Sequence, residues 1–286
     1  MKITDIIKGN RPSLSFEVFP PKTDSAYDGV RAAAAEIAAL SPAYMSVTYG
    51  AGGSTAGYTA EIASSLLALG VTPLAHLSCI GASRESIREK LADLSARGIE
   101  NVLALRGDLP EGVAPTDLTY RYASSLAEEI RDFGGFCIGG ACYPEKHPES
   151  VDSDADIESL RIKVDSGCSF LTTQMFFDNS ILYNFLYRLL RRGIDVPVVA
   201  GIMPLTNAAQ IKRICSISGT ALPARFLRIV ERYGDNPAAM KQAGIAFATE
   251  QIIDLYANGV NAVHVYSMNK PDVAATIRAN LSEILA

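Results

Sequence analysis

The chain of 286 residues is long enough to bury one large hydrophobic core or to divide into two domains. Its 26 basic and 31 acidic residues leave a formal charge of −5, which argues against nucleic acid as the main partner because phosphate binding needs a basic face. No apolar run approaches the roughly 18 residues of a membrane span, and residues 1–5 carry early charge without an apolar signal core. We therefore expect neither a membrane partner nor a secretory signal.

Cysteine and histidine are sparse and are not spaced as metal ligands. The cysteines form no C-x-x-C pair, and none of the three histidines belongs to an H-x-H or H-E-x-x-H pattern. Four cysteines lie in or beside apolar segments, so we predict small buried thiols in a reducing, cytoplasmic compartment and no dedicated metal site. These four are Cys79, Cys137, Cys142 and Cys168, and the fifth is Cys215.

Residues 14–19 are predicted to form the first strand, because apolar residues surround a single carboxylate and the following Pro20-Pro21 cannot donate to a ladder. Glu17 lies between Phe16 and Val18 near the carboxyl end of this strand. Apolar surroundings should raise the pKa of Glu17, and a raised pKa suits a general acid. The alternative is a strand-end glutamate whose side chain points to solvent.

The rest of the chain alternates short apolar segments with segments of helical period. Ser83 is expected to cap one helix, and Gly98 is expected to end it. The predicted strands cover residues 14–19, 43–48, 71–77, 101–105, 136–142, 169–174, 197–201 and 262–266. The predicted helices cover residues 25–40, 58–69, 83–96, 116–132, 154–166, 179–192, 207–217, 222–232, 236–257 and 272–285.

Eight short strands alternating with helices over about 250 residues are typical of an α/β fold of the (β/α)8 TIM-barrel type. We predict a single domain over residues 1–286, in which the helix at 222–232 is an extra element before the last strand. A doubly wound open sheet has the same local pattern and is the main alternative. The number of strands favours the barrel.

In such a barrel the catalytic groups lie at the carboxyl ends of the strands. The sequence has polar residues at most of these ends, so we expect them to share one face. Each has a structural alternative: His76 can be a core histidine, and Arg106 can form an ion pair with Asp108. The strand-end residues are Glu17, Thr48, Tyr49, His76, Arg106, Asp108, Tyr143, His147, Gln174, Tyr266, Asn269 and Lys270.

A glycine-rich segment at residues 49–55 follows a predicted strand and precedes a helix. A dinucleotide-binding fingerprint that starts at Gly50 would need glycine at position 55, where Thr55 stands, and no G-x-x-x-x-G-K-[ST] sequence is present. We therefore predict a permissive loop near a ligand and not a Rossmann or P-loop site.

Six motifs occur in the order in which one enzyme family carries them. They are Ser15-Phe-Glu-Val-Phe-Pro-Pro-Lys22, Ser46-Val-Thr-Tyr-Gly-Ala51, Leu105-Arg-Gly-Asp-Leu-Pro110, Tyr143-Pro-Glu-Lys-His-Pro148, Lys163-Val-Asp-Ser-Gly167 and Thr173-Gln-Met-Phe-Phe-Asp178. In these motifs the chain resembles the 5,10-methylenetetrahydrofolate reductases, from about Leu14 to Lys270. It is similar to their short bacterial form, a catalytic barrel without a regulatory C-terminal domain.

The resemblance implies a (β/α)8 barrel that binds FAD non-covalently at its carboxyl face and serves one-carbon metabolism and methionine biosynthesis. NADH or NADPH would reduce the flavin and leave before methylenetetrahydrofolate enters the same site. The flavin contacts implied by position are Thr48, Tyr49, Ala51, His76, Arg106, Gly107, Asp108, Tyr122, Ala123, Tyr143, His147, Asp156 and Lys163. The substrate contacts implied in the same way are Gln174, Gln210 and Lys270.

The resemblance also implies roles for individual residues. Glu17 would deliver the proton that opens the five-membered folate ring to an iminium cation, and hydride from the flavin would then give 5-methyltetrahydrofolate. Asp108 would stabilise the cation and make the reduced flavin a stronger donor. Arg106 and Lys163 would hold the flavin diphosphate.

Two positions depart from the family pattern. Ile214 stands where related enzymes can carry a phenylalanine that packs on the nicotinamide or folate, which leaves the electron donor open. Ile162 stands where a second basic residue can precede Lys163. Some short family members work beside a partner subunit that can deliver electrons, and relatives form homo-oligomers, so the resemblance allows both arrangements.

Three other functions remain open at this point. A flavin barrel similar to proline dehydrogenase would not need Glu17. A flavin-free pterin-binding barrel of the methyltransferase or pteroate synthase type would not need Tyr143, His147 and Lys163. A subunit that binds FAD or folate only as a partner module would not need Glu17 together with Asp108.

Overall fold

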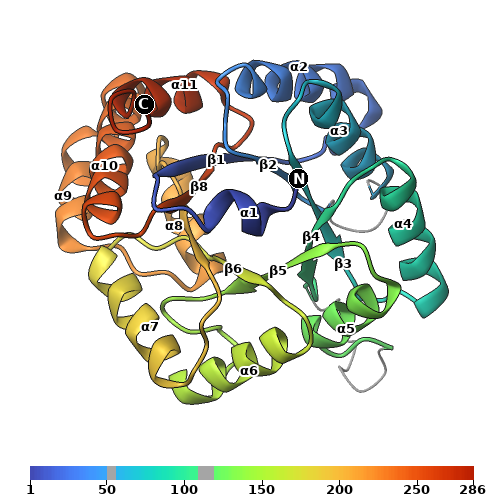
Figure 1. The fold of residues 1–286 in the computed structure, drawn as a ribbon. Coiled ribbons are helices and arrows are strands. Elements are labelled where there is room, and N and C mark those ends of the chain that lie inside the picture. The colour runs from blue at the N-terminus through green and yellow to red at the C-terminus, as the bar shows by residue number, and fades with distance from the viewer. Residues whose placement is uncertain (50–55, 109–118) are drawn as a thin grey trace.

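A computed structural model gives the fold of the chain and describes residues 1–49, 56–108 and 119–286. Within these ranges eight parallel strands form a closed barrel in sequence order, and β8 pairs with β1 (Figure 1). The predicted (β/α)8 barrel is confirmed, and the open sheet is excluded because β1 and β8 are not edges. The strands are β1 (Ser13–Val18), β2 (Met45–Val47), β3 (Pro73–Ser78), β4 (Asn101–Leu105), β5 (Cys137–Cys142), β6 (Phe170–Thr173), β7 (Val198–Ile202) and β8 (Ala262–Tyr266).

Helices form the outer ring around the strands (Figure 1). Between β7 and β8 the chain forms α8, α9 and α10, and α9 is the extra helix that the sequence predicts at residues 222–232. The short 3-10 helix η1 (Asp24–Ala26) leads into α2. The helices are α1 (Ile3–Ile7), α2 (Tyr27–Ala38), α3 (Ala56–Ala68), α4 (Arg84–Ala96), α5 (Ala123–Phe133), α6 (Ser153–Asp165), α7 (Asn179–Arg191), α8 (Ala208–Ser218), α9 (Ala224–Tyr233), α10 (Pro237–Ala257) and α11 (Pro271–Asn280).

Side chains of one strand alternate between the helical layer and the barrel interior. Phe16 and Val18 of β1 are fully buried in the main hydrophobic cluster, where they join side chains of α2 such as Ile37. Glu17 lies between them in the sequence and therefore points to the opposite side, into the barrel. Phe16 and Val18 thus do not form its environment, contrary to the sequence-based expectation.

The predicted capping residues of α4 are found at its two ends. Ser83 caps α4, because its hydroxyl accepts a hydrogen bond from the Ser86 amide at 3.2 Å. Gly98 follows α4 with a φ of 76°, so the predicted cap and terminator are both confirmed.

Helix α5 begins later than the predicted range of 116–132, and this boundary is wrong. The helix starts at Ala123, and Tyr122 before it is extended, with φ −138° and ψ 159°. The Tyr120 side chain is 2% exposed, so packing anchors the approach to the helix in a non-helical path. Here the packing of Tyr120 overrides the helix propensity of the preceding residues.

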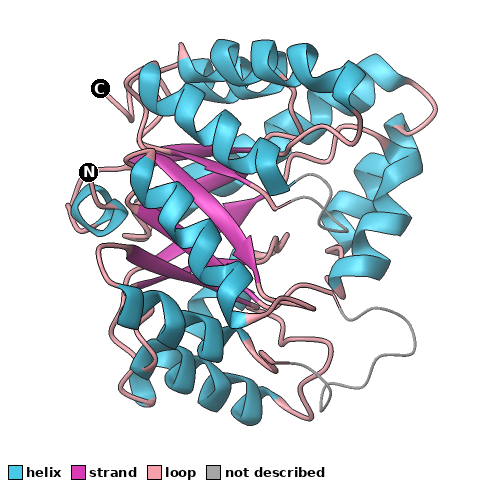
Figure 2. Cartoon of the chain, turned by 90° about the vertical axis from the view of Figure 1, so that its right-hand side faces the viewer, coloured by secondary structure: helices cyan, strands magenta, loops and turns pink. Residues whose placement is uncertain are grey.

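Helix α1 was not predicted, because five residues are too few to display a helical period. It lies across one mouth of the barrel (Figures 1 and 2). Ile3 and Ile7 are buried in one hydrophobic cluster with Leu74 of β3, Leu103 of β4 and Phe170 of β6. Apolar side chains of α1 therefore cover the amino-terminal mouth of the barrel interior.

The burial of the cysteines agrees with the sequence-based expectation. All five cysteines are free, and Cys79, Cys137, Cys142 and Cys168 are buried as predicted. Among the described residues, no helix combines the length and apolar character needed to cross a membrane. The same residues contain no cluster of three or more His, Cys, Asp or Glu side chains arranged to hold a metal ion.

Candidate active site

A cavity of about 750 Å³ opens at the carboxyl ends of β3, β4 and β5. This volume lies in the range typical of small-molecule and cofactor sites. Its walls combine apolar residues such as Ile80 and Leu105 with charged side chains. The sequence-predicted residues that line it are Tyr49, Arg106, Gly107, Asp108, Ala123, Tyr143, His147 and Lys163.

Lys163 reaches this cavity from α6 across the face of β5. A Cβ atom on Gly140 would lie 2.7 Å from the Lys163 Cδ atom, so glycine at this position leaves room for the lysine stem. The ammonium donates to the Ala141 carbonyl oxygen at 2.6 Å. Burial lowers the pKa of Lys163, because it disfavours the charged form. An ammonium has three donors, and an anionic ligand would use those left over.

Arg106 lies at the end of β4, but its partner is not the one considered from the sequence. Its guanidinium binds Glu149 through two hydrogen bonds of 2.6 Å, whereas the sequence suggested an ion pair with Asp108. Glu149 is 53% exposed and Arg106 17% exposed. Hydrogen bonding to Glu149 raises the pKa of Arg106, so its positive charge is permanent at the cavity wall.

Gly107 continues this wall with a backbone that requires glycine. Its φ is 90°, and an added Cβ would lie 2.3 Å from Ser78 Oγ and 2.7 Å from Ile80 Cγ2. The backbone of residues 106–108 can therefore approach a ligand closely.

Asp156 of α6 holds the loop after β5 through hydrogen bonds. This carboxylate is 6% exposed and accepts the His147 amide at 3.2 Å and the Ser150 hydroxyl at 2.9 Å. Tyr143 and His147 meet edge to face with their ring centres 4.6 Å apart. Asp156 is not among the residues that line the cavity, so its contribution in this structure is to hold the loop.

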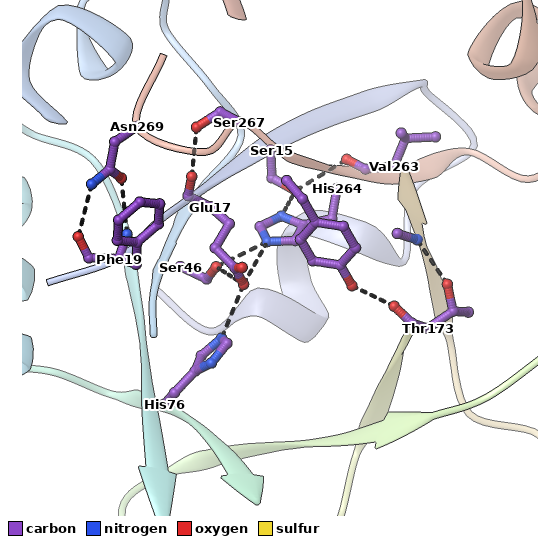
Figure 3. A network of polar contacts seen from close by, with 12 residues as sticks. Ser15, Glu17, Phe19, Ser46, His76, Thr173, Val263, His264, Ser267 and Asn269 are labelled. Carbon is purple, nitrogen blue, oxygen red and sulfur yellow. Dashed lines mark hydrogen bonds and ion pairs between the residues drawn. The ribbon is translucent and has the colours of Figure 1, made fainter. Parts of the chain in front are cut away.

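Glu17 belongs to a polar cluster inside the barrel (Figure 3). Its Oε2 atom accepts a hydrogen bond from Ser46 Oγ at 3.1 Å and lies 3.5 Å from His76 Nε2 and 3.8 Å from His264 Nε2. Ser46 Oγ is also 2.9 Å from His264 Nε2, and His264 Nδ1 is 2.7 Å from Ser15 Oγ. Because Ser46 donates to Glu17, it must accept from the Nε2–H of His264. One hydroxyl donor and two imidazole rings therefore lie beside one carboxylate.

The expected rise in the pKa of Glu17 is wrong. Burial by itself raises this pKa, but the nearby imidazoles of His264 and His76 and the hydrogen bond from Ser46 together lower it below 4.5. Burial also lowers the pKa of His76 from 6.5 to about 4. In the free protein at neutral pH, Glu17 is therefore a carboxylate and His76 a neutral imidazole.

The Glu17 cluster is continuous with the cavity along β3. His76 contacts Glu17, and Ser78, two residues further on the same side of the strand, lines the cavity. Two strand residues span roughly 6.6 Å. A ligand bound in the cavity and a second group near Glu17 would thus lie next to each other.

The remaining predicted residues are spread around this face. The Thr48 carbonyl accepts from Thr59 Oγ1 at 2.9 Å, and Tyr122 is 52% exposed. The side chain of Gln174 folds back on its own backbone, because its Oε1 accepts a hydrogen bond from the backbone N–H of Met175 at 2.9 Å. Gln210 is exposed on α8, and Ala51 lies outside the described residues. Lys270 Nζ is 3.1 Å from Thr206 Oγ1.

Sequence reasoning did not single out four residues that shape the site. Ser46 and His264 surround Glu17, Glu149 holds Arg106, and Lys90 lies 5.5 Å from the centre of the Tyr49 ring. Ser46 and Glu149 fall within or directly after the quoted motifs, and His264 is a polar residue in an apolar strand. These signals were present, but the partners lie on other strands or loops.

The fold and the site define a (β/α)8-barrel protein with a basic, cofactor-sized cavity beside a buried carboxylate–histidine cluster. The sequence profile of methylenetetrahydrofolate reductase matches residues 2–282, so this chain belongs to the methylenetetrahydrofolate reductase family.

Relatives from plants and bacteria agree with this assignment. The chain is 34% identical to methylenetetrahydrofolate reductase (NADH) 1 of Arabidopsis thaliana over 305 residues, covering 99% of this chain and 51% of the relative. It is 33% identical to the 5,10-methylenetetrahydrofolate reductase of Pectobacterium carotovorum over 268 residues, covering 93% and 89%. The chain thus spans about half the length of the plant relative and most of the bacterial one.

A solved structure supports the fold independently. A protein from Clostridium thermocellum, described as binding two copies of 5-methyl-5,6,7,8-tetrahydrofolic acid, superposes with a TM-score of 0.66 at 12% identity over 99% of both chains. At this identity the similarity extends to the barrel architecture alone.

Proposed function

We propose that this chain catalyses the FAD-dependent reduction of 5,10-methylenetetrahydrofolate to 5-methyltetrahydrofolate, with NADH or NADPH as the source of hydride. Membership of the family and its bacterial relatives of similar length support the reaction. The observation that carries the proposal is the position of Glu17, which contacts His76 on the same strand that lines the cavity.

The donors in the cavity fit the chemistry of FAD. Lys163 and Arg106 are cations suited to a diphosphate, and the Ala104, Leu105 and Ala123 side chains offer apolar surface to a ring system. Arg106 would share its guanidinium between a phosphate and Glu149, or release Glu149 to solvent. When bound, FAD supplies a carrier that takes hydride from the nicotinamide and passes it to the folate.

Reduction of the folate consumes a proton as well as a hydride. The proton goes to the ring nitrogen that leaves the bridging carbon, and Glu17 is the group we assign to deliver it. Because its pKa is low in the free protein, Glu17 must gain a proton as the folate binds. A folate ring over the 18% exposed side chain would remove its water and raise its pKa.

The other roles follow from charge and position. Opening the ring leaves a cation on the folate, which the carboxylate of Asp108 at the cavity wall would stabilise. Lys270 carries a positive charge suited to the carboxylate end of a folate. Gln174 and Gln210 can donate and accept hydrogen bonds with the pterin once they turn from their present positions.

An anaerobic absorption experiment tests the proposal. The purified protein is saturated with FAD, reduced with NADH or NADPH, and then mixed with methylenetetrahydrofolate. Bleaching of the flavin by one nicotinamide and recovery of its colour with the folate are the expected results, and the faster nicotinamide identifies the donor. A flavin that neither nicotinamide bleaches, but that folate reoxidises after chemical reduction, would indicate electron delivery by a partner protein. A protein that cannot bind FAD would refute the proposal.

A further inference from the structure

The hydrogen-bond ladder of β1 stops directly after Glu17 and Val18, where the chain needs another partner. The last pair with β8 is Glu17 with Tyr266, and the last pair with β2 is Val18 with Val47. The next residue, Phe19, precedes two buried prolines that have no N–H to offer. Partly buried backbone groups of Phe19 must therefore find hydrogen bonds elsewhere.

The side chain of Asn269 provides both of them (Figure 3). Its Oδ1 accepts the Phe19 amide at 2.9 Å, and its Nδ2 donates to the Phe19 carbonyl at 2.9 Å. A carboxamide has the same donor and acceptor as a peptide group, so Asn269 takes the place of a neighbouring strand. Ser267 adds a hydrogen bond of 2.6 Å from its hydroxyl to the Glu17 carbonyl.

The backbone of this turn is in an uncommon conformation. Met268 and Asn269 have φ values of 55° and 53°, both in the left-handed region. Such residues cost on the order of 1 kcal/mol each unless they are Gly, Asn or Asp, and they concentrate at functional sites. Asn269 thus suits the position both by its backbone preference and by its side chain.

The same turn also carries Lys270, the residue predicted to meet the folate. Lys270 directly follows Asn269, and its Nζ is 3.1 Å from Thr206 Oγ1 in the connection after β7. A single four-residue segment, 267–270, therefore joins the backbone of the proposed proton donor to a proposed substrate contact.

We propose that Asn269 is a positioning residue that sets the direction of the Glu17 side chain relative to the bound folate. This inference rests on the proposed function for its consequence in catalysis, but not for its geometry. Without the Asn269 amide, the chain after Val18 loses two hydrogen bonds, and the Glu17 carboxylate moves out of its cluster with Ser46 and His76. Displacement of a reacting group by about 1 Å can cost 100-fold in rate.

The test compares Asn269→Gly with Asn258→Gly. Glycine adopts the left-handed conformation without cost, so Asn269→Gly removes the amide while keeping the turn. Asn258 is an exposed residue at the end of α10 whose amide binds Asp254, which makes it a matched control remote from the strand ends. In Asn269→Gly we expect folate-dependent reoxidation of the reduced flavin to slow between 10-fold and 100-fold. Reduction by nicotinamide and the affinity for FAD stay within twofold of the unaltered protein.

A crystal structure of Asn269→Gly provides a readout that does not depend on activity. We expect the Glu17 carboxylate to leave hydrogen-bond distance of Ser46 Oγ. If it stays at about 3.1 Å, or if both half-reactions slow equally, the inference is overturned. Failure of the unaltered protein to reoxidise with folate would refute the proposed function, whereas the crystal structure would still decide the positioning role.

Discussion

His76 should make the stability of the protein depend on pH. Burial lowers its pKa, the charge of Glu17 partly offsets this effect, and the neighbouring His264 adds to it, so that the pKa falls from 6.5 to about 4. Between these values the unfolded chain binds a proton at this residue and the folded chain does not. The contribution of His76 to the free energy of unfolding therefore has its full value above pH 6.5 and decreases as the pH drops toward 4. At about 1.4 kcal/mol per pH unit, this difference amounts to roughly 3 kcal/mol.

The substitution His76→Gln removes the titrating imidazole and keeps a neutral hydrogen-bond donor near Glu17. Urea unfolding at pH 7.0 and pH 4.5, roughly the ends of the window, measures the effect. The unaltered protein should lose about 2 to 3 kcal/mol more than His76→Gln between these two conditions. His147→Gln is the matched control, because His147 is half-buried and its pKa is lowered less. Equal losses in the unaltered protein and in His76→Gln would show that His76 does not stay neutral in the fold.

Three further substitutions test other parts of the site. Glu17→Gln should slow folate-dependent reoxidation of the flavin by about 10²–10⁴ and leave nicotinamide-dependent reduction unchanged in stopped-flow absorbance; a parallel loss of both steps would contradict its role as the acid. Lys163→Met should weaken FAD binding by about 10- to 100-fold in a fluorescence titration, because it removes a charge-assisted hydrogen bond of about 1.5–3 kcal/mol, while the surface variant Lys241→Met should bind normally. Gly107→Ala should cost about 2–4 kcal/mol in urea unfolding, since a Cβ would lie 2.3 Å from Ser78 Oγ at a φ of 90°. Gly259→Ala, with a φ of 82° and no described atom within 4 Å of its Cβ, should cost only about 1 kcal/mol, and an equal loss in both would exclude the clash.

The sequence by itself was sufficient for the barrel and for the face that carries the candidate site. Short apolar strands alternating with helices follow from local preferences and from burial on both faces of a parallel sheet. Polar residues such as Arg106 and Tyr143 at strand ends then fall on one side, because parallel strands all point the same way. The closed order of the strands confirms this reasoning.

Only the tertiary structure decided the electrostatic state of that site. The pKa of Glu17 depends on His264, which β8 brings beside β1 from 247 positions away along the chain, through the pairing of Ser15 with His264. In the same way Glu149, not Asp108, holds Arg106, and Asn269 completes the end of β1. Local sequence reports which groups a strand carries, but a pKa or a side-chain direction is set by neighbours across space. Closure of the barrel between its first and last strands places His264 and Asn269 beside β1, and no local pattern encodes that contact.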